Sequence, residues 1–355
     1  MRPAIGIFVA ISAVFGSNVM KANQTITNTS SSDRELIILA APNTDGYYDE
    51  VQPDIVDFHI RYAKAIRERD DVIVLAGQGL APTYRKALGA EHVAVMPMDD
   101  IWMRDFSPLN AAEPVMMRYS AAGQGGGRKG QREADFVQDG LAELLAEAGV
   151  QIPESDLIND GGNFVDDYNG RVVLSRKFLR DNDLSESEGR SAVKATTGAE
   201  HVAFIEADEQ GGLEHADGVV AFVGPNTLVI NSYSEDPGYA ADLKADLRRG
   251  LPGVTIHEIV TPYDGSNIYD ERFGSACGLY TNMLVTPHRI YVPQFGIPED
   301  TVALEQLSQW TDLELVPVSS EGVCYMGGGV RCMSWQLRGP AAQSLKAWLL
   351  LQSEG

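Results

Sequence analysis

The segment Gly327-Gly328-Gly329-Val330-Arg331-Cys332-Met333-Ser334-Trp335 joins three consecutive glycines to an apolar run that has a single cysteine at its head. Glycine lets the backbone adopt positive φ and lets a ligand approach the main chain closely. A thiol becomes a nucleophile where its surroundings favour the thiolate. The segment is therefore typical of a nucleophile at a pocket wall. An arbitrary cysteine is more often a small buried apolar residue, so partners elsewhere in the chain must decide between the two interpretations.

Outward from this segment, short apolar strands alternate with helical segments, which is the pattern of an α/β protein. Strands are predicted at Leu36–Ala40, Asp71–Leu75, His92–Met96, Arg171–Ser175, His201–Ile205, Val219–Val223, Thr227–Asn231, Val254–Val260, Met283–Thr286, Ile290–Val292 and Leu315–Val318. Helices are predicted at Pro53–Arg67, Glu133–Ala148, Tyr239–Arg249, Asp300–Trp310 and Ala341–Leu351. The spacing of several tens of residues per unit favours a modular ring or layered sheet over one doubly wound sheet. No break in composition marks a second domain, so residues 34–355 are predicted to form one.

The first residues have the pattern of a targeting segment. Arg2 is followed by an uncharged, largely apolar run over residues 3–19, the length of a secretory signal core and short for a membrane span. We predict a signal peptide over residues 1–22, a disordered polar linker over 23–33 and export of the protein. The alternatives are a buried first helix or initiation at Met20, with a cytoplasmic location. Of the three cysteines, Cys277 and Cys324 are the most plausible disulfide pair, which leaves Cys332 free for chemistry.

The composition excludes some functions. The 355-residue chain has a formal net charge of -22 and a pI near 4.6, which argues against nucleic-acid binding and is compatible with a cationic small molecule. The six histidines show no metal-ligand spacing such as His-x-x-x-His, so no metal is expected. No membrane association is expected after signal cleavage. The sequence does not determine the oligomeric state.

Four strand ends are rich in glycine or acidic residues: Trp102–Asp105, Asp160–Asn163, Glu214–Gly218 and Gly327–Cys332. Each alone is most simply explained as a turn or a helix cap. Together they supply a thiol, a histidine that can transfer protons near neutral pH, and carboxylates that can each fork two hydrogen bonds onto a planar guanidinium. The combination indicates a thiol reaction at the carbon of a guanidine.

The motifs resemble a known family. They are Trp102-Met103-Arg104-Asp105, Asp160-Gly161-Gly162-Asn163, His215-Ala216-Asp217, Tyr280-Thr281-Asn282, Val292-Pro293-Gln294-Phe295-Gly296 and Gly327-Gly328-Gly329-Val330-Arg331-Cys332. In this order they resemble the agmatine deiminase and bacterial-type peptidylarginine deiminase family, from about Arg34 to the C-terminus. The resemblance implies a pentein fold, a five-bladed α/β propeller of ββαβ modules with a central active site. It also implies hydrolysis of a guanidine to a ureido group and ammonia, without metal or organic cofactor.

The resemblance also implies roles for individual residues. Cys332 matches the nucleophile and His215 the general acid and base. Asp105 and Asp217 match the carboxylates that bind the guanidinium, and Asn282 matches a polar residue near the thiol. Asp160 stands where agmatine deiminases have a glutamate, and the shorter acid would bind the substrate less closely. The residues predicted to contribute to substrate binding are Asp160, Trp102, Asn282, Arg331, Gly328 and Gly329.

Two departures from the family bear on the substrate. Arg331 replaces the usual histidine before the cysteine, and its charge would either depress the Cys332 pKa or point outward. The glycine-rich segment Ala121–Arg132 is predicted to be a flexible loop whose basic residues either face the substrate or are simply solvated. Secreted peptidylarginine enzymes bind the carboxylate of a C-terminal arginine with loop arginines, and Arg118, Arg128 and Arg132 lie in the corresponding region.

The sequence therefore predicts hydrolytic deimination of peptidyl-arginine, arginine or agmatine through a thiouronium on Cys332. The secretory start favours peptidyl or free arginine over agmatine. The alternatives are transfer of the amidino group to an amine, and an inactive pentein that binds arginine-like ligands or a partner protein.

Overall fold

The computed structural model describes residues 34–43, 46–208 and 212–352 of the chain. The predicted signal peptide and polar linker lie outside the described residues.

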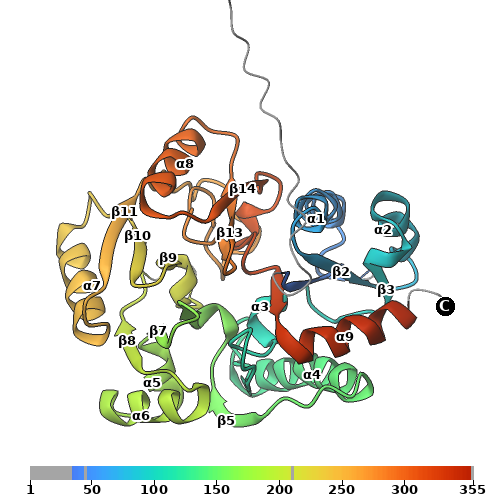
Figure 1. The fold of residues 1–355 in the computed structure, drawn as a ribbon, viewed down its shortest axis with the longest axis horizontal. Coiled ribbons are helices and arrows are strands. Elements are labelled where there is room, and N and C mark those ends of the chain that lie inside the picture. The colour runs from blue at the N-terminus through green and yellow to red at the C-terminus, as the bar shows by residue number, and fades with distance from the viewer. Residues whose placement is uncertain (1–33, 44–45, 209–211, 353–355) are drawn as a thin grey trace, which may run out of the picture.

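Five sheets follow one another around a ring in the order of the chain (Figure 1). Three of them are three-stranded units in which an antiparallel hairpin is followed by helix and a parallel strand: β6-β7-β8, β9-β10-β11 and β12-β13-β14. The second sheet pairs β4 with β5, and an isolated bridge between Leu109 and Val115 precedes β4. The described strands are β1 Leu36–Ala40, β2 Asp71–Ala76, β3 Val93–Val95, β4 Met116–Arg118, β5 Glu154–Ile158, β6 Val165–Asp166, β7 Arg171–Ser175, β8 His201–Ile205, β9 Val220–Gly224, β10 Thr227–Asn231, β11 Thr255–Ile259, β12 Leu284–Val285, β13 Arg289–Gln294, β14 Glu314–Ser319 and β15 Ser334–Leu337.

The first sheet closes the ring because its strands come from both ends of the chain. Its order is β15-β1-β2-β3, and β15 pairs antiparallel with β1 so that Ile38 lies opposite Trp335. The strand β1 then runs parallel to β2, with a helix between them. The segment that carries Cys332 is thus held in place by the first strand of the fold.

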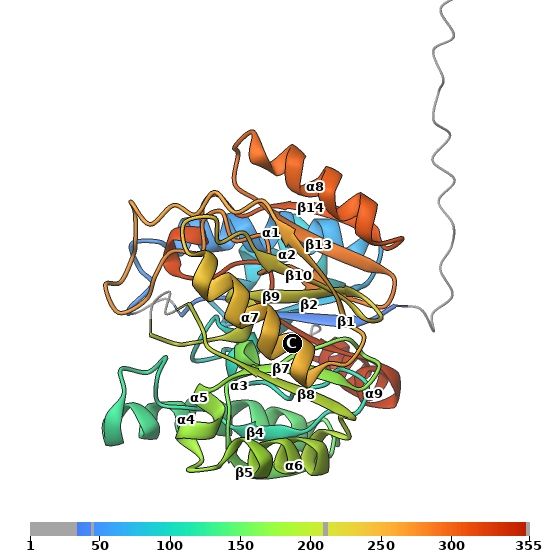
Figure 2. The same cartoon turned by 90° about the vertical axis from the view of Figure 1, so that its left-hand side faces the viewer.

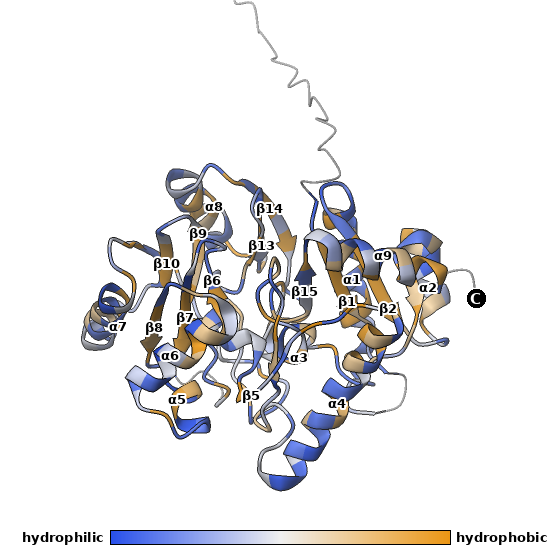
Figure 3. Ribbon diagram, turned by 60° about the horizontal axis from the view of Figure 1, so that its bottom comes forward, coloured by the Kyte–Doolittle hydropathy of each residue, from blue (hydrophilic) through white to orange (hydrophobic). Residues whose placement is uncertain are grey.

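Most helices lie on the outside of the ring, with α8 and α4 at opposite edges, whereas the single-turn helix α3 lies near its centre (Figures 1 and 2). Their bounds are α1 Gln52–Arg67, α2 Ala81–Leu88, α3 Met103–Phe106, α4 Gly127–Glu147, α5 Lys177–Asp181, α6 Glu186–Thr197, α7 Pro237–Gly250, α8 Glu299–Trp310 and α9 Gly339–Leu351. Each long helix turns one apolar side to its sheet, and the strands are the most hydrophobic part of the ribbon (Figure 3). In α1 the buried side carries Ile55, Phe58, Tyr62 and Ile66. Each such side chain stabilises the fold by about 1.5–3 kcal/mol relative to its exposed state.

A buried ion pair links the last unit to the first. Arg289 of β13 donates from Nη1 to Asp70 Oδ1 at 3.0 Å, and the hydroxyl of Tyr291 donates to the other oxygen of Asp70 at 2.6 Å. Asp70 lies immediately before β2, so this contact joins units that are far apart in the sequence. A buried pair of this kind is costly to break, because removing one partner leaves the other charge uncompensated.

The predicted strands and helices are all present, with shifts of a few residues at their ends. The segment Ala121–Arg132 was predicted to be a flexible loop, and this prediction is wrong for its second half. From Gly127 onward the chain forms the first part of α4. A Cβ at Gly130 would lie 2.7 Å from the Gln124 carbonyl, so glycine there lets the preceding loop pack on the helix. Phe136 is an apolar residue of the helix predicted at Glu133–Ala148, yet it is 59% exposed. The sequence pattern did not predict α2, α3 and α5, which are short, or α6, whose buried side carries Val193 as its one large apolar residue. It also did not predict β4, β5, β6 and β15, whose patterns are short, weak or irregular.

No helix among the described residues is long and apolar enough to cross a membrane.

Candidate active site

Five short turns carry the predicted site residues to one region of the ring. Each turn lies just before the first strand of a unit, where the chain enters the sheet. Asp105 lies in α3, Asp160 immediately before the 3-10 turn Gly161–Asn163, and Asp217 in the 3-10 turn Ala216–Gly218. Asn282 and Cys332 each lie two residues before a strand, β12 and β15. Because every unit has the same direction, the five turns converge at the same end of the sheets.

All of these residues except Asp160 line a cavity that we call the inner cavity. Its lining includes Cys332, His215, Asp105, Asp217, Trp102 and Asn282. The rest of the lining is Tyr119, Gly123, Ala207, Asp208, Leu213, Glu214, Gly218, Phe273, Ser275, Ala276, Leu279, Met326 and Gly327. The carboxylates therefore face a space whose other walls are largely apolar, where charged hydrogen bonds are stronger than in water.

The thiol of Cys332 is buried and held by two polar side chains. Asn282 Nδ2 donates to its sulfur at 3.0 Å, and the thiol faces Asp217 Oδ2 at 3.8 Å. Burial, followed by the negative charges of Asp217 and Asp105, raises the pKa of the Cys332 thiol well above its ordinary value. The hydrogen bond from Asn282 acts in the opposite direction. The thiol is therefore protonated at neutral pH until another positive charge enters the cavity.

His215 lies between two carboxylates. Its Nε2 lies 3.0 Å from Asp160 Oδ2, and its Nδ1 lies 3.7 Å from Asp105 Oδ1. Burial opposes a charge on the ring, but the charges of Asp105 and Asp160 outweigh it and raise the pKa of His215 to about 9. Burial raises the pKa of Asp105 to about 7, against the effect of His215. At neutral pH the histidine is thus an imidazolium, which a general acid must be.

Asp160 does not line the inner cavity, although it was predicted to bind substrate. It lies behind His215, and its two oxygens also accept hydrogen bonds from the backbone N–H and the hydroxyl of Ser120, both at 2.8 Å. Burial would raise the pKa of Asp160, but the hydrogen bond and charge of His215 lower it below its ordinary value. The geometry makes Asp160 a partner that orients and charges the histidine through Nε2, while Nδ1 lies on the side of Asp105.

Arg331 is also outside the cavity lining, and it points inward rather than to solvent. Its guanidinium donates to Asp217 Oδ2 at 2.6 Å and to the Phe164 carbonyl at 2.6 Å. The sequence left open whether Arg331 would lower the pKa of Cys332 or point outward, and the structure shows that its guanidinium is buried beside Asp217. Arg331 neutralises Asp217 and so reduces the negative charge beside the thiol, which favours the thiolate of Cys332.

At two positions a neighbouring side chain lies so close to the backbone that only glycine fits. A Cβ at Gly162 would lie 2.4 Å from His215 Nδ1, and the Gly162 N–H donates to Asp105 Oδ1 at 3.2 Å. A Cβ at Gly328 would lie 2.5 Å from the Trp102 ring and 2.8 Å from Cys332 Cβ. Gly328 and Gly329, both predicted to bind substrate, are not in the cavity lining, whereas Gly327 is. Gly328 makes room for the indole that forms the wall.

The arginines considered as carboxylate ligands lie elsewhere. Arg118 forms two hydrogen bonds with Asp135, at 2.9 and 2.8 Å, on the outer surface. Arg128 and Arg132 are exposed on the first turns of α4 and are absent from the lining of the inner cavity.

The predicted disulfide is confirmed, since Cys277 and Cys324 are bonded and Cys332 is free. The bond joins two segments that line the inner cavity, one leading to Asn282 and the other to Cys332.

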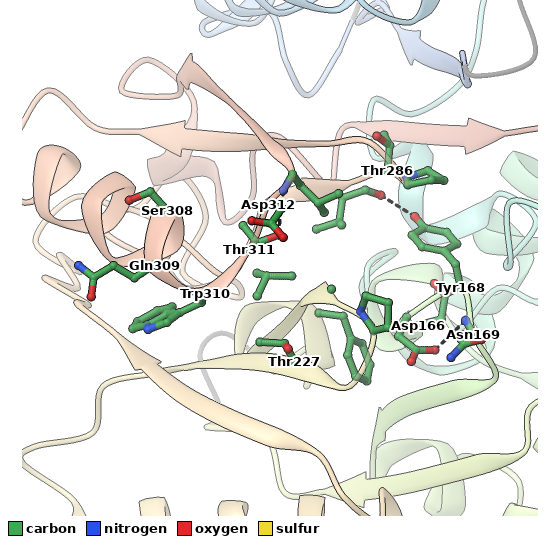
Figure 4. A pocket seen from close by; sticks show the side chains of 18 of the residues that line it. Asp166, Tyr168, Asn169, Thr227, Thr286, Ser308, Gln309, Trp310, Thr311 and Asp312 are labelled. Carbon is green, nitrogen blue, oxygen red and sulfur yellow. Dashed lines mark hydrogen bonds between the residues drawn. The ribbon is translucent and has the colours of Figure 1, made fainter. Parts of the chain in front are cut away.

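A second cavity is formed by turns between strands and by the chain that follows α8 (Figure 4). Its lining includes Asp166, Tyr168, Thr227, Thr286 and Trp310, and none of the residues predicted for the site. These turns follow the first strands of their units, whereas the site residues precede them, so the two cavities lie at opposite ends of the sheets.

Sequence reasoning missed Ser120 and the Phe164 carbonyl, because a lone serine and a backbone oxygen carry no motif. The contacts of Arg331 with Asp217 and with the Phe164 carbonyl could not be deduced from the sequence for the same reason.

Comparison with solved structures identifies the fold. Agmatine deiminase of Enterococcus faecalis is 19% identical and superposes with a TM-score of 0.70 over 86% of this chain and 94% of that one. The agmatine deiminase of C. jejuni is 18% identical, with a TM-score of 0.72 over 87% and 94%. This likeness shows that the fold is the predicted α/β pentein fold.

The family follows from the sequence comparisons. The model of the Porphyromonas-type peptidyl-arginine deiminase family matches residues 29–337. A Lactococcus lactis protein described as an agmatine deiminase is 25% identical over 345 residues, which span 85% of this chain and 92% of that protein. The chain belongs to the Porphyromonas-type peptidyl-arginine deiminase family. It is a guanidine deiminase, a hydrolase that acts on C–N bonds.

Proposed function

We propose that this chain deiminates its guanidine substrate through a covalent thiouronium on Cys332, with His215 as proton donor and acceptor. The observation that carries the proposal is the convergence of Cys332, His215, Asp105 and Asp217 on one cavity from strand entries far apart in the sequence.

The substrate guanidinium binds between two carboxylates. Asp105 and Asp217 both face the inner cavity, and Arg331 already takes one oxygen of Asp217. Asp105 is therefore the carboxylate with most capacity to compensate the positive charge of the substrate, and binding favours its ionised form. The two fixed carboxylates hold the planar guanidinium so that its carbon lies near the sulfur of Cys332. This orientation lowers the free-energy barrier to attack by the thiolate.

Binding also prepares the thiol. The pKa of Cys332 is raised by burial and by the negative charges of Asp217 and Asp105. A bound guanidinium opposes both charges, so it lowers that pKa and favours the thiolate. Asn282 donates a hydrogen bond to the sulfur at 3.0 Å and keeps it oriented.

The thiolate attacks the guanidinium carbon, forming a C–S bond while the π electrons of one C–N bond move onto nitrogen. His215 protonates a terminal nitrogen, whose bond to carbon breaks to release ammonia and leave the thiouronium on Cys332. Water then adds to the same carbon and gives a proton to His215. The C–S bond breaks and its electron pair returns to the sulfur of Cys332 as the thiolate. The product oxygen gives its remaining proton to solvent, and the neutral ureido product leaves.

The test is a substrate panel of agmatine, L-arginine and peptides with internal or C-terminal arginine, assayed for both ammonia and ureido product. We expect Cys332→Ala to abolish both products and Asn282→Ala to lower kcat more than it raises KM. Full ammonia release by Cys332→Ala would refute the mechanism. A new guanidine formed when an acceptor amine is added would instead indicate amidino transfer.

We further propose that the protein is exported. The apolar run over residues 3–19 and the Cys277–Cys324 disulfide support this, since disulfides persist mainly in oxidising compartments. N-terminal sequencing of the protein recovered from the source cells should show that a segment of about 22 residues has been removed. An intact N-terminus on protein confined to the cytoplasm would refute export.

A further inference from the structure

A groove adjoins the inner cavity and shares part of its lining, and we call it the outer groove. It is lined by Tyr47, Tyr48, Asp99, Asp100, Trp102, Gly123, Gln124, Tyr269, Arg272, Phe273 and Met326. Four of these residues, Trp102, Gly123, Phe273 and Met326, also line the inner cavity. A substrate whose guanidine lies at Cys332 and that extends past Trp102 therefore enters the outer groove.

Three tyrosines form one wall of the outer groove. The ring of Tyr47 lies 4.9 Å from that of Tyr48 and 5.2 Å from that of Tyr269, in both cases edge to face. The hydroxyl of Tyr269 donates to the Tyr47 carbonyl, and the hydroxyl of Tyr48 donates to the buried Asp100 at 2.7 Å. Tyr47 is nonetheless 48% exposed. The rings are thus fixed before any ligand arrives, and they offer flat apolar faces at little entropic cost.

Arg272 is held at the junction of the two cavities. Asp270 accepts from its Nε at 3.0 Å and from its Nη2 at 2.5 Å, and Tyr47 donates its hydroxyl to the same carboxylate. The guanidinium carbon lies 5.0 Å from the centre of the Phe273 ring, and Phe273 lines both cavities. Among the described residues that line either cavity, Arg272 is the one lysine or arginine. Its side chain is about half exposed, so its Nη1 edge can donate to an oxygen of a bound molecule.

We propose that the outer groove is a substrate subsite for an aromatic acyl group or aromatic amino-acid residue joined to arginine. In this arrangement Arg272 donates to a carbonyl or carboxylate oxygen at the junction, and the aromatic group packs on the tyrosines. The proposal rests on the deiminase function above and names its preferred substrates as acylated or peptidyl arginines. Agmatine and free arginine leave the outer groove empty.

The experiment separates the aromatic group from the carboxylate. Steady-state kcat/KM is measured for agmatine, N-benzoylagmatine, L-arginine and Nα-benzoyl-L-arginine. We expect the benzoyl group to raise kcat/KM about 3- to 10-fold within each pair, which is the range for one or two aromatic contacts. A carboxylate that reaches Arg272 gives Nα-benzoyl-L-arginine a higher kcat/KM than N-benzoylagmatine, whereas contact of Arg272 with the benzoyl carbonyl alone gives the two benzoyl compounds equal kcat/KM.

Substitutions in the outer groove test which residues produce the preference for the benzoyl compounds. Tyr269→Ala is expected to remove most of the benzoyl advantage while leaving kcat/KM for agmatine within about twofold. Arg272→Gln is expected to raise KM for Nα-benzoyl-L-arginine about tenfold with little change in kcat, as loss of one charged hydrogen bond does. The matched controls are Phe136→Ala and Arg128→Gln, which remove an exposed ring and an exposed guanidinium on α4, outside both cavities.

Equal kcat/KM with and without the benzoyl group would overturn the proposal. So would a benzoyl advantage that survives Tyr269→Ala and Arg272→Gln, or that the two control variants lose equally. Failure of the deiminase function itself gives a different result, namely no ureido product from any of the four compounds.

Discussion

The sharpest consequence of the site geometry is the effect of Asp160→Asn on the pH dependence of the reaction. Asp160 contacts His215 Nε2 at 3.0 Å, and asparagine keeps the size of the side chain while it removes the charge. With both carboxylates present, the pKa of His215 is about 9. His215 acts as a general acid, so activity is present below this pKa and is lost as the pH rises through it.

The magnitude follows from the two carboxylates that flank the ring. The rise from the ordinary value of 6.5 to about 9 corresponds to roughly 3 kcal/mol of preference for the imidazolium. Asp105 and Asp160 are the main sources of that preference, so loss of one is expected to lower the pKa by about one unit. The alkaline limb of kcat/KM should therefore move from near pH 9 to near pH 8.

The assay is ammonia release with L-arginine or agmatine from about pH 6 to about pH 10. Asp160→Glu restores the charge and should keep the alkaline limb within about half a unit of the wild-type position. Ser120→Ala removes one hydrogen bond to Asp160 but no charge, so its shift should be the smaller. An unchanged limb, with activity lowered equally at every pH, would show that Asp160 has only a structural role and would refute the reasoning.

Three further substitutions test other contacts. Arg331→Met removes the 2.6 Å hydrogen bond to Asp217, and we expect kcat/KM to fall by about 100-fold or more because the buried carboxylate loses its partner. Arg331→Lys keeps the charge and should recover part of the lost kcat/KM. An equal loss in both variants would contradict a role for the charge. Gly162→Ala places a methyl group 2.4 Å from His215 Nδ1, so the histidine must shift. We expect kcat to fall about 10- to 100-fold while the circular dichroism spectrum stays that of the wild type. An unchanged kcat would refute the close packing of His215 on Gly162. Glu35→Gln tests a carboxyl whose pKa is raised to about 8, first by burial. Because the folded protein holds this proton and the unfolded chain does not, wild-type stability should decline between about pH 4.5 and pH 8, and urea unfolding of the variant should show a flatter decline.

Local sequence patterns were sufficient for most of the elements. The short continuous apolar runs of β1, β7 and β10 and the helical spacing in α1 depend on neighbours a few positions away, so they can be predicted without knowledge of the fold. Phe136 shows the limit, because the pattern of α4 alone does not tell which of its apolar residues the sheet leaves uncovered. The first part of α4 was missed because glycine predicts loop until tertiary packing stabilises a helix.

The sequence by itself also identified the chemical groups of the site, because a free thiol, a histidine and acids at strand ends are visible as residue types. Only the tertiary structure decided which atoms meet. It placed Asp160 behind His215 instead of in the cavity, and it turned Arg331 inward onto Asp217. It also placed Arg272 in the outer groove, next to the inner cavity, although Arg272 belongs to none of the sequence motifs. The physical reason is that closure of the ring joins segments hundreds of residues apart, and the contacts that this creates have no counterpart in local periodicity.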